Sequence, residues 1–123
     1  MKTREYQKDG FAVTVDRVLD EDADLSYLED YADESPSDRA KYLAQGKARL
    51  EAYDRGEWYM LGIVVTIRKQ TPSNWANGGL EVGRASIWGY ESDSEEGFLK
   101  SEEESIASEA WREVEQLKAS LAA

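Results

Sequence analysis

Alternating apolar and polar positions predict the strands of this chain. Residues 10–19 carry Phe, Val and Val at every second position, which is the period of a strand. Residues 57–69 are apolar on both alternating sets of positions, as expected for a strand in the middle of its sheet. Residues 80–90 predict a third strand, and the Pro- and Gly-containing loop before it favours an antiparallel hairpin. Residues 3–7 allow a fourth, short strand.

A helical repeat predicts two main helices. The string SPSD at 35–38 is typical of a helix start, and this helix is expected to run to Arg55 and end at Gly56. The string SDSE at 92–95 has the spacing of a capping box, followed by a helix to about Leu121. Its apolar stripe favours core, with a dimer seam as the alternative; the stripe contains Ile106, Ala110, Val114, Leu117 and Leu121.

These elements predict one α+β domain over residues 1–123. We expect a small antiparallel sheet of three to four strands with two main helices packed on one face. A chain of 123 residues is typical of one domain with one core. The apolar fraction of 41% and the four tryptophans argue against disorder. Trp58 and Trp88 fall in predicted strands, so we interpret both as core.

The residue types present argue against catalysis and metal binding. There is no histidine and no cysteine, which removes the commonest general base, the commonest transition-metal ligand and any disulfide. The string DEDAD at 20–24 suggests a calcium loop, but Leu25 and Tyr31 occupy the positions where an EF-hand needs Gly and Glu. We therefore expect no enzymatic activity, no cofactor and no metal site.

The sequence also argues against insertion into a membrane. The longest apolar run, at 58–65, has eight residues, whereas a bilayer span needs about 20. The first ten residues lack the apolar stretch of a signal peptide. We therefore expect a cytoplasmic protein.

Acidic residues concentrate at the two ends of the chain. The net charge of −11 divides into −8 over residues 1–38, +4 over 39–88 and −7 over 89–123. Such a distribution repels nucleic acid and anionic membranes and attracts basic surfaces, many of which bind nucleic acid. The charge therefore favours a protein-binding module over an enzyme.

The density of this charge bears on whether the protein imitates DNA. Residues 91–115 hold ten acids and two bases. As a helix they would span ~37 Å, a length over which a DNA duplex carries ~22 charges. Residues 20–34 add eight acids and no base. The helix alone is too dilute, but the two segments side by side would approach the density of a duplex, and the sequence leaves open whether they meet.

We expect the partner-binding surface to combine carboxylates of both segments with one loop tryptophan, since aromatic residues dominate binding hot spots. For this tryptophan the alternative is that its ring folds back onto the sheet edge. The protein is expected to be a monomer or a homodimer. The predicted contact residues are Asp20, Glu21, Asp22, Asp24, Glu29, Asp30, Trp75, Glu91, Asp93, Glu95, Glu96, Glu102 and Glu103.

A second hypothesis is a small-molecule or cation-binding accessory protein. It depends on four aromatic residues that would have to line one pocket. These are Tyr27, Tyr31, Trp88 and Tyr90.

Four strings of the chain resemble one family of proteins. They are DADLSYLEDY at 22–31, YDRGEWYMLGI at 53–63, GGL at 78–80 and WGYESDS at 88–94. Together they resemble a family of small acidic proteins, without an assigned activity, carried on bacterial phages, plasmids and genomic islands. Tyr90 stands where that family's W-G-I-E-S-D-S motif has Ile.

The resemblance implies an origin on mobile elements, where small acidic proteins often inhibit host defences. It favours a non-enzymatic protein that binds the basic surface of a nucleic-acid-binding protein. Inhibition of a CRISPR or restriction system by DNA mimicry is the function that it suggests.

Overall fold

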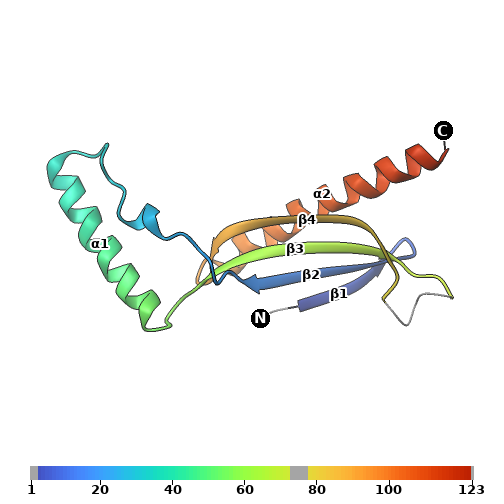
Figure 1. Cartoon of the computed structure of the whole chain (residues 1–123), viewed down its shortest axis with the longest axis horizontal. Coiled ribbons are helices and arrows are strands. Elements are labelled where there is room, and N and C mark those ends of the chain that lie inside the picture. The colour runs from blue at the N-terminus through green and yellow to red at the C-terminus, as the bar shows by residue number, and fades with distance from the viewer. Residues whose placement is uncertain (1–2, 73–77, 123) are drawn as a thin grey trace.

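The computed structural model describes residues 3–72 and 78–122 and has the predicted α+β class. An antiparallel sheet has the strand order β1-β2-β3-β4, so strands that follow one another in the chain are also neighbours in the sheet (Figure 1). The strands are β1 (Thr3–Lys8), β2 (Phe11–Leu19), β3 (Met60–Lys69) and β4 (Leu80–Glu91); the helices are η1 (Ser26–Leu28, a 3-10 turn), α1 (Pro36–Asp54) and α2 (Glu96–Ala122).

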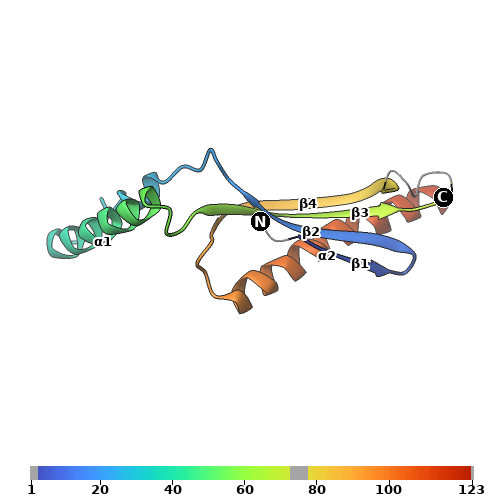
Figure 2. The same ribbon diagram turned by 90° about the horizontal axis from the view of Figure 1, so that it is seen from below.

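Helix α2 crosses one face of the sheet, and the main core lies between them (Figures 1 and 2). β3 is flanked by β2 and β4 and is buried along most of its length, which confirms its central position. The core residues are Phe11, Val13, Val15, Leu61, Ile63, Val65, Ile67, Tyr90, Leu99, Ile106, Ala110 and Val114. Most of the apolar stripe of α2 is therefore core, while Leu117 and Leu121 remain 40% and 79% exposed.

Within the described ranges, no helix packs on the opposite face of the sheet (Figure 2). The Trp88 ring lies over Gly62 on this face: a Cβ at Gly62 would be 2.3 Å from Trp88 Cε3. Trp88 is 48% exposed, so the prediction that it belongs to the core is wrong, whereas Trp58 is 2% exposed as predicted. A period of two identifies a strand but not which of its faces is covered.

The helix α1 and the turn η1 lie on an excursion between β2 and β3 that projects from one end of the sheet (Figure 1). Ser35 caps α1 as predicted, because its Oγ accepts the N–H of Asp38 at 3.3 Å. The two helices pack against the sheet at different places. α2 covers a face, whereas α1 packs at the end of β3 through a second core made of Leu28, Trp58 and Met60 with Leu50 and Tyr53.

The predicted capping box at 92–95 is wrong. Ser92 Oγ accepts the N–H of Tyr59 at 2.9 Å, and Ser92 donates its own N–H to the carbonyl of Tyr59 at 2.8 Å. These bonds extend the pairing of β3 with β4 by one step, so the helix begins later, at Glu96. α2 then continues through Gly97 without interruption.

Charged groups are buried between β2 and α2. Arg17 is 6% exposed and Glu103 is 4% exposed, and their side chains lie 3.1 Å apart. Arg17 also makes two hydrogen bonds to Glu96, at 2.8 and 2.9 Å, and these hydrogen bonds are the main reason that its pKa is raised. The guanidinium of Arg4 adds a weaker contact to Glu103 at 3.7 Å. This network joins the start of α2 to β2.

No helix in the described part of the chain is long and apolar enough to cross a membrane.

Substituting Arg17→Met should lower the free energy of unfolding by about 3 kcal/mol, because it leaves a buried carboxylate without its main partner. The double variant Arg17→Met, Glu103→Leu should recover most of this loss, because both buried charges are then removed. Urea unfolding followed by tryptophan fluorescence measures both values. A double variant as unstable as the single one would contradict the assignment of the loss to an unpaired charge.

Candidate functional site

The acidic segment, residues 20–34, leaves the end of β2 as an irregular chain with one 3-10 turn. Two of its carboxylates stabilise local backbone turns. Asp20 Oδ1 accepts the N–H of Asp22 at 3.1 Å, and Asp24 Oδ1 accepts the N–H of Ser26 at 2.9 Å. The bond from Ser26 lowers the pKa of Asp24. All eight acids of the segment are exposed except Asp20, which is half-buried.

The acidic segment packs against α1 at Gly46, where the helix has no side chain. Leu28 is 8% exposed, and a Cβ at Gly46 would lie 1.9 Å from the Leu28 carbonyl oxygen. Glycine is therefore required for η1 to approach the helix this closely. The rings of Tyr31 and Tyr42, 5.6 Å apart, add a second contact between the segment and the helix.

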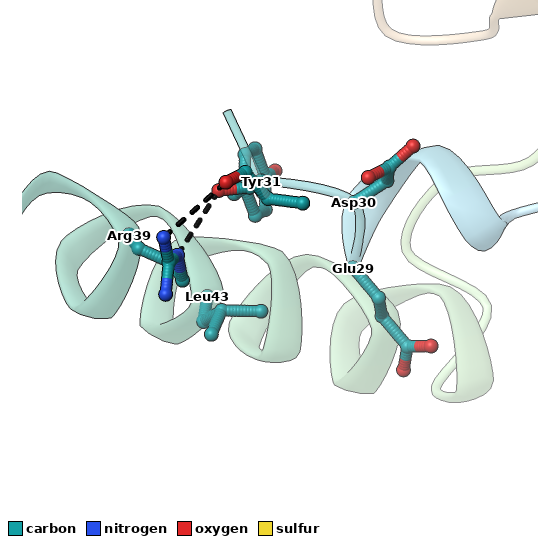
Figure 3. A pocket seen from close by; sticks show the side chains of 6 residues that line it. Glu29, Asp30, Tyr31, Arg39 and Leu43 are labelled. Atoms are coloured by element: carbon teal, nitrogen blue, oxygen red, sulfur yellow. Dashed lines mark hydrogen bonds between the residues drawn. The ribbon is translucent and has the colours of Figure 1, made fainter. Parts of the chain in front are cut away.

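Arg39 holds the last part of the acidic segment through backbone atoms. Its guanidinium donates to the carbonyls of Tyr31, Ala32 and Glu34 at 3.1–3.3 Å. Figure 3 shows the carboxylates of Glu29 and Asp30 pointing away from this guanidinium. The shallow cavity here has about 290 Å³ and is lined by Glu29, Asp30, Tyr31, Ala32, Arg39 and Leu43. Arg39 thus orders the segment without forming ion pairs with these two carboxylates.

A second arginine ties α1 to the end of the sheet. Arg49 contacts Glu91 at 2.8 Å and Asp93 at 2.5 Å. Its guanidinium carbon also lies 3.8 Å from the centre of the Trp58 ring, and Trp58 Nε1 donates to the carbonyl of Arg49 at 2.9 Å. We call Arg49, Trp58, Glu91 and Asp93 the Arg49 cluster. No pattern in the sequence predicted this cluster, because its members lie far apart in the chain.

The Arg49 cluster shifts the protonation of its neighbours. Hydrogen bonding to Arg49 lowers the pKa of Asp93 from its ordinary value of 3.8. Burial, followed by the negative charge of Glu91, raises the pKa of Tyr27, which lies beside the cluster on η1. Both pKa shifts favour the forms that these groups already have at neutral pH, the ionised carboxylate of Asp93 and the neutral phenol of Tyr27.

The predicted contact residues fall into distinct groups. Those of the acidic segment lie at the end of the molecule that carries α1 (Figure 1). Glu91 and Asp93 bind Arg49, while Glu96 and Glu103 bind Arg17. Glu102 lies near Tyr90, whose pKa is raised by burial and by the charge of Glu102. Glu95 is exposed just before α2, and Trp75 lies outside the described residues.

The two acid-rich segments lie close together only where the second begins, since Glu91 and Asp93 lie near Tyr27 of η1. α2 starts near the end of the sheet from which α1 projects and then runs along the sheet away from α1 (Figures 1 and 2). The Arg49 cluster lies at the junction between them. The combined face that would approach the charge density of a duplex is therefore not formed, and the acidic segment is the densest remaining group of exposed acids.

The structure does not bring the four aromatic residues of the second hypothesis together. Tyr90 is buried in the main core, 6.2 Å from the ring of Phe98, whereas Trp88 lies on the opposite face of the sheet. Tyr31 lies in the cavity beside Arg39. The described ranges also contain no group of three or more acidic side chains arranged to hold a metal ion.

No protein-family model, curated protein or solved structure matches the chain.

Substituting Gly46→Ala should lower the free energy of unfolding by about 2–3 kcal/mol, because the new methyl group collides with the Leu28 carbonyl. The matched control is Gly97→Ala in α2, where a Cβ meets no atom within 4 Å. The control should gain about 0.5–1 kcal/mol from helix propensity. Urea unfolding measures both, and equal changes in the two variants would show that η1 does not rest on Gly46.

Substituting Asp93→Asn should lower stability at neutral pH and leave it unchanged in strong acid. Because the folded-state pKa of Asp93 lies below 3.8, its contribution is complete well above pH 3.8 and is lost as the pH falls through the folded-state value. The measurement is the difference in unfolding free energy between wild type and variant from pH 7 to pH 2. Glu51→Gln, an exposed change on α1, is the control. A difference that grows toward low pH would contradict the ion pair.

Proposed function

We propose that this chain is a non-enzymatic, cytoplasmic interaction protein whose acidic segment binds a basic surface of another protein. The observation that supports the proposal most directly is the state of the carboxylates at residues 20–34. Seven of the eight acids are exposed, and the arginine beside them, Arg39, binds backbone oxygens. A concentration of exposed negative charge on an ordered surface attracts cationic partners and accelerates their association.

The acidic segment has the properties that make such a surface specific. It is bound to α1 at Gly46 and through Arg39, so its carboxylates are displayed on an ordered backbone. Ordering before binding reduces the entropy lost in the complex. The excursion also projects from the sheet, which leaves the segment accessible to a large partner (Figure 1).

A nucleic-acid-binding protein is the partner class that this chemistry favours. Such proteins carry rows of Lys and Arg placed to contact phosphates. The carboxylates of the acidic segment resemble the charges along a short stretch of phosphate backbone. Because α2 runs away from the segment, its carboxylates do not continue this row of charges along a longer duplex. We therefore favour a protein that blocks a local phosphate-binding site. The resemblance to mobile-element proteins makes a CRISPR or restriction component the first partner to test.

The test is affinity capture from nuclease-treated bacterial lysate, with elution by a salt gradient. The neutralised variant carries Asp20→Asn, Asp22→Asn, Asp24→Asn, Glu29→Gln and Asp30→Asn. The amide oxygens that replace the carboxylates at positions 20 and 24 can still accept the backbone N–H groups that fold the segment. We expect wild type to retain a nucleic-acid-binding protein that elutes with salt, and the variant to lose it by about tenfold or more.

The matched control removes five acids elsewhere and so reaches the same net charge. It carries Glu5→Gln, Asp9→Asn, Glu51→Gln, Glu104→Gln and Glu115→Gln, all at exposed positions. Retention of the partner by this control, together with competition by a short DNA duplex, would support a local acidic site. Equal losses in both variants, or binding that salt does not weaken, would contradict the proposal.

A further inference from the structure

One edge of the sheet is left open at β4. β4 pairs with β3 on one side, and no described strand pairs with it on the other. The N–H of Arg84 points to this open side, because it donates to Glu113 Oε2 at 2.9 Å. In an antiparallel strand the direction alternates, and the register with β3 is regular from Gly83 to Trp88. The N–H and C=O groups of Ser86 and Trp88 therefore point to the open edge as well.

A groove runs between this edge and α2. Two cavities, of about 450 and 250 Å³, adjoin along it and share Ala85 and Glu109 in their walls. Ile106 lies in the wall of the larger cavity, and so does Ile87, which is 49% exposed. α2 crosses beneath β4 and emerges beyond it (Figure 1). A strand added to the edge would therefore rest on α2 and would cover an exposed isoleucine.

The charges that line the groove balance, although the chain as a whole is acidic. The chain carries −11, yet the charged residues of the groove are two bases, Arg84 and Arg112, and two acids, Glu109 and Glu113. A strongly basic partner gains little electrostatic attraction from this groove, because the groove has no net charge and the acidic segment lies elsewhere. A two-fold contact between copies brings the same patch against itself and needs such balance, because two acidic proteins otherwise repel each other.

We propose that residues 84–88 of β4 pair antiparallel with the same residues of a second copy along this edge, with the two-fold axis at Ser86. This register places Ala85 of each copy opposite Ile87 of the other, above α2. On the other face it places Arg84 opposite Trp88 of the second copy, both about half exposed, as a cation–π pair. The main chain of the second copy replaces Glu113 at the N–H of Arg84. The dimer has one continuous sheet, and its two acidic segments lie at opposite poles.

The oligomeric state tests this proposal. Sedimentation equilibrium should give a concentration-dependent mass that rises toward twice the 13.9 kDa of one chain. Ile87→Lys should weaken association about a hundredfold, because the apolar contact is lost twice across the axis. Leu121→Lys, at a leucine that is 79% exposed near the end of α2, is the matched control and should leave association unchanged.

A cross-link tests the register. The chain has no cysteine. Ser86→Cys should form a disulfide dimer on mild oxidation, because paired Cα atoms on facing strands lie about 5.5 Å apart. Ser37→Cys on α1 is the exposed control and should remain monomeric.

Three outcomes would overturn the proposal: a monomer at all concentrations, a dimer that Leu121→Lys disrupts while Ile87→Lys does not, or equal cross-linking at residues 86 and 37. These measurements use the purified chain alone, so they stand or fall independently of the acidic segment and its partner.

Discussion

The position of the acidic segment depends on how Arg49 is held. This side chain is 29% exposed, and ion pairs at such sites are individually weak. Three contacts act together here, however: the guanidinium binds two carboxylates, stacks on Trp58, and belongs to a residue whose carbonyl accepts the Trp58 N–H. The combination fixes α1 at the end of β3 and β4. Since η1 rests on α1 at Gly46, the placement of the acidic segment follows from that of α1.

Acidic side chains have different roles in this molecule according to where the fold places them. Arg17 and Arg49 together bind four acids of the 91–115 segment, so these charges stabilise the molecule from within. The acids of residues 20–34 are mostly exposed, and Arg39 binds the carbonyls of Tyr31, Ala32 and Glu34 rather than carboxylates of the segment. A net charge of −11 therefore overstates what a partner would encounter at any one site. The charge concentrated on one ordered segment is the quantity that matters for binding.

Most of the fold could be predicted from the sequence, because it depends on local signals. The apolar pattern of 57–69 indicated the central strand, and Ser35 with Pro36 marked the start of α1. The errors arose where distant residues decide the structure. Ser92 has the local signature of a helix cap, but its hydroxyl is used by Tyr59, and Trp88 has the pattern of a core residue on a face that no described helix covers.

The candidate site could be predicted only as a list of acids. Composition identified the acid-rich segments, but it could not show which carboxylates face an arginine. Arg17 reaches Glu103 across 86 residues of sequence, and Arg49 reaches Asp93 across 44. Ion pairs of this kind leave no periodicity in the chain, because they depend on the register of β2 under α2 and on the distance between α1 and the end of β4.

The excursion that carries the acidic segment also bears on how the chain folds. Leu19 and Leu61 are paired, and Asp20 donates its N–H to Met60 at 2.9 Å, so the excursion leaves and returns at one point of the sheet. Closing a loop of this length costs only about 2–3 kcal/mol more than closing a tight hairpin, since the entropy grows with the logarithm of loop length. The length of the excursion therefore adds little to the entropic cost of pairing β2 with β3. An insertion joined to its host at one point can vary in length and sequence while the core beneath it stays the same.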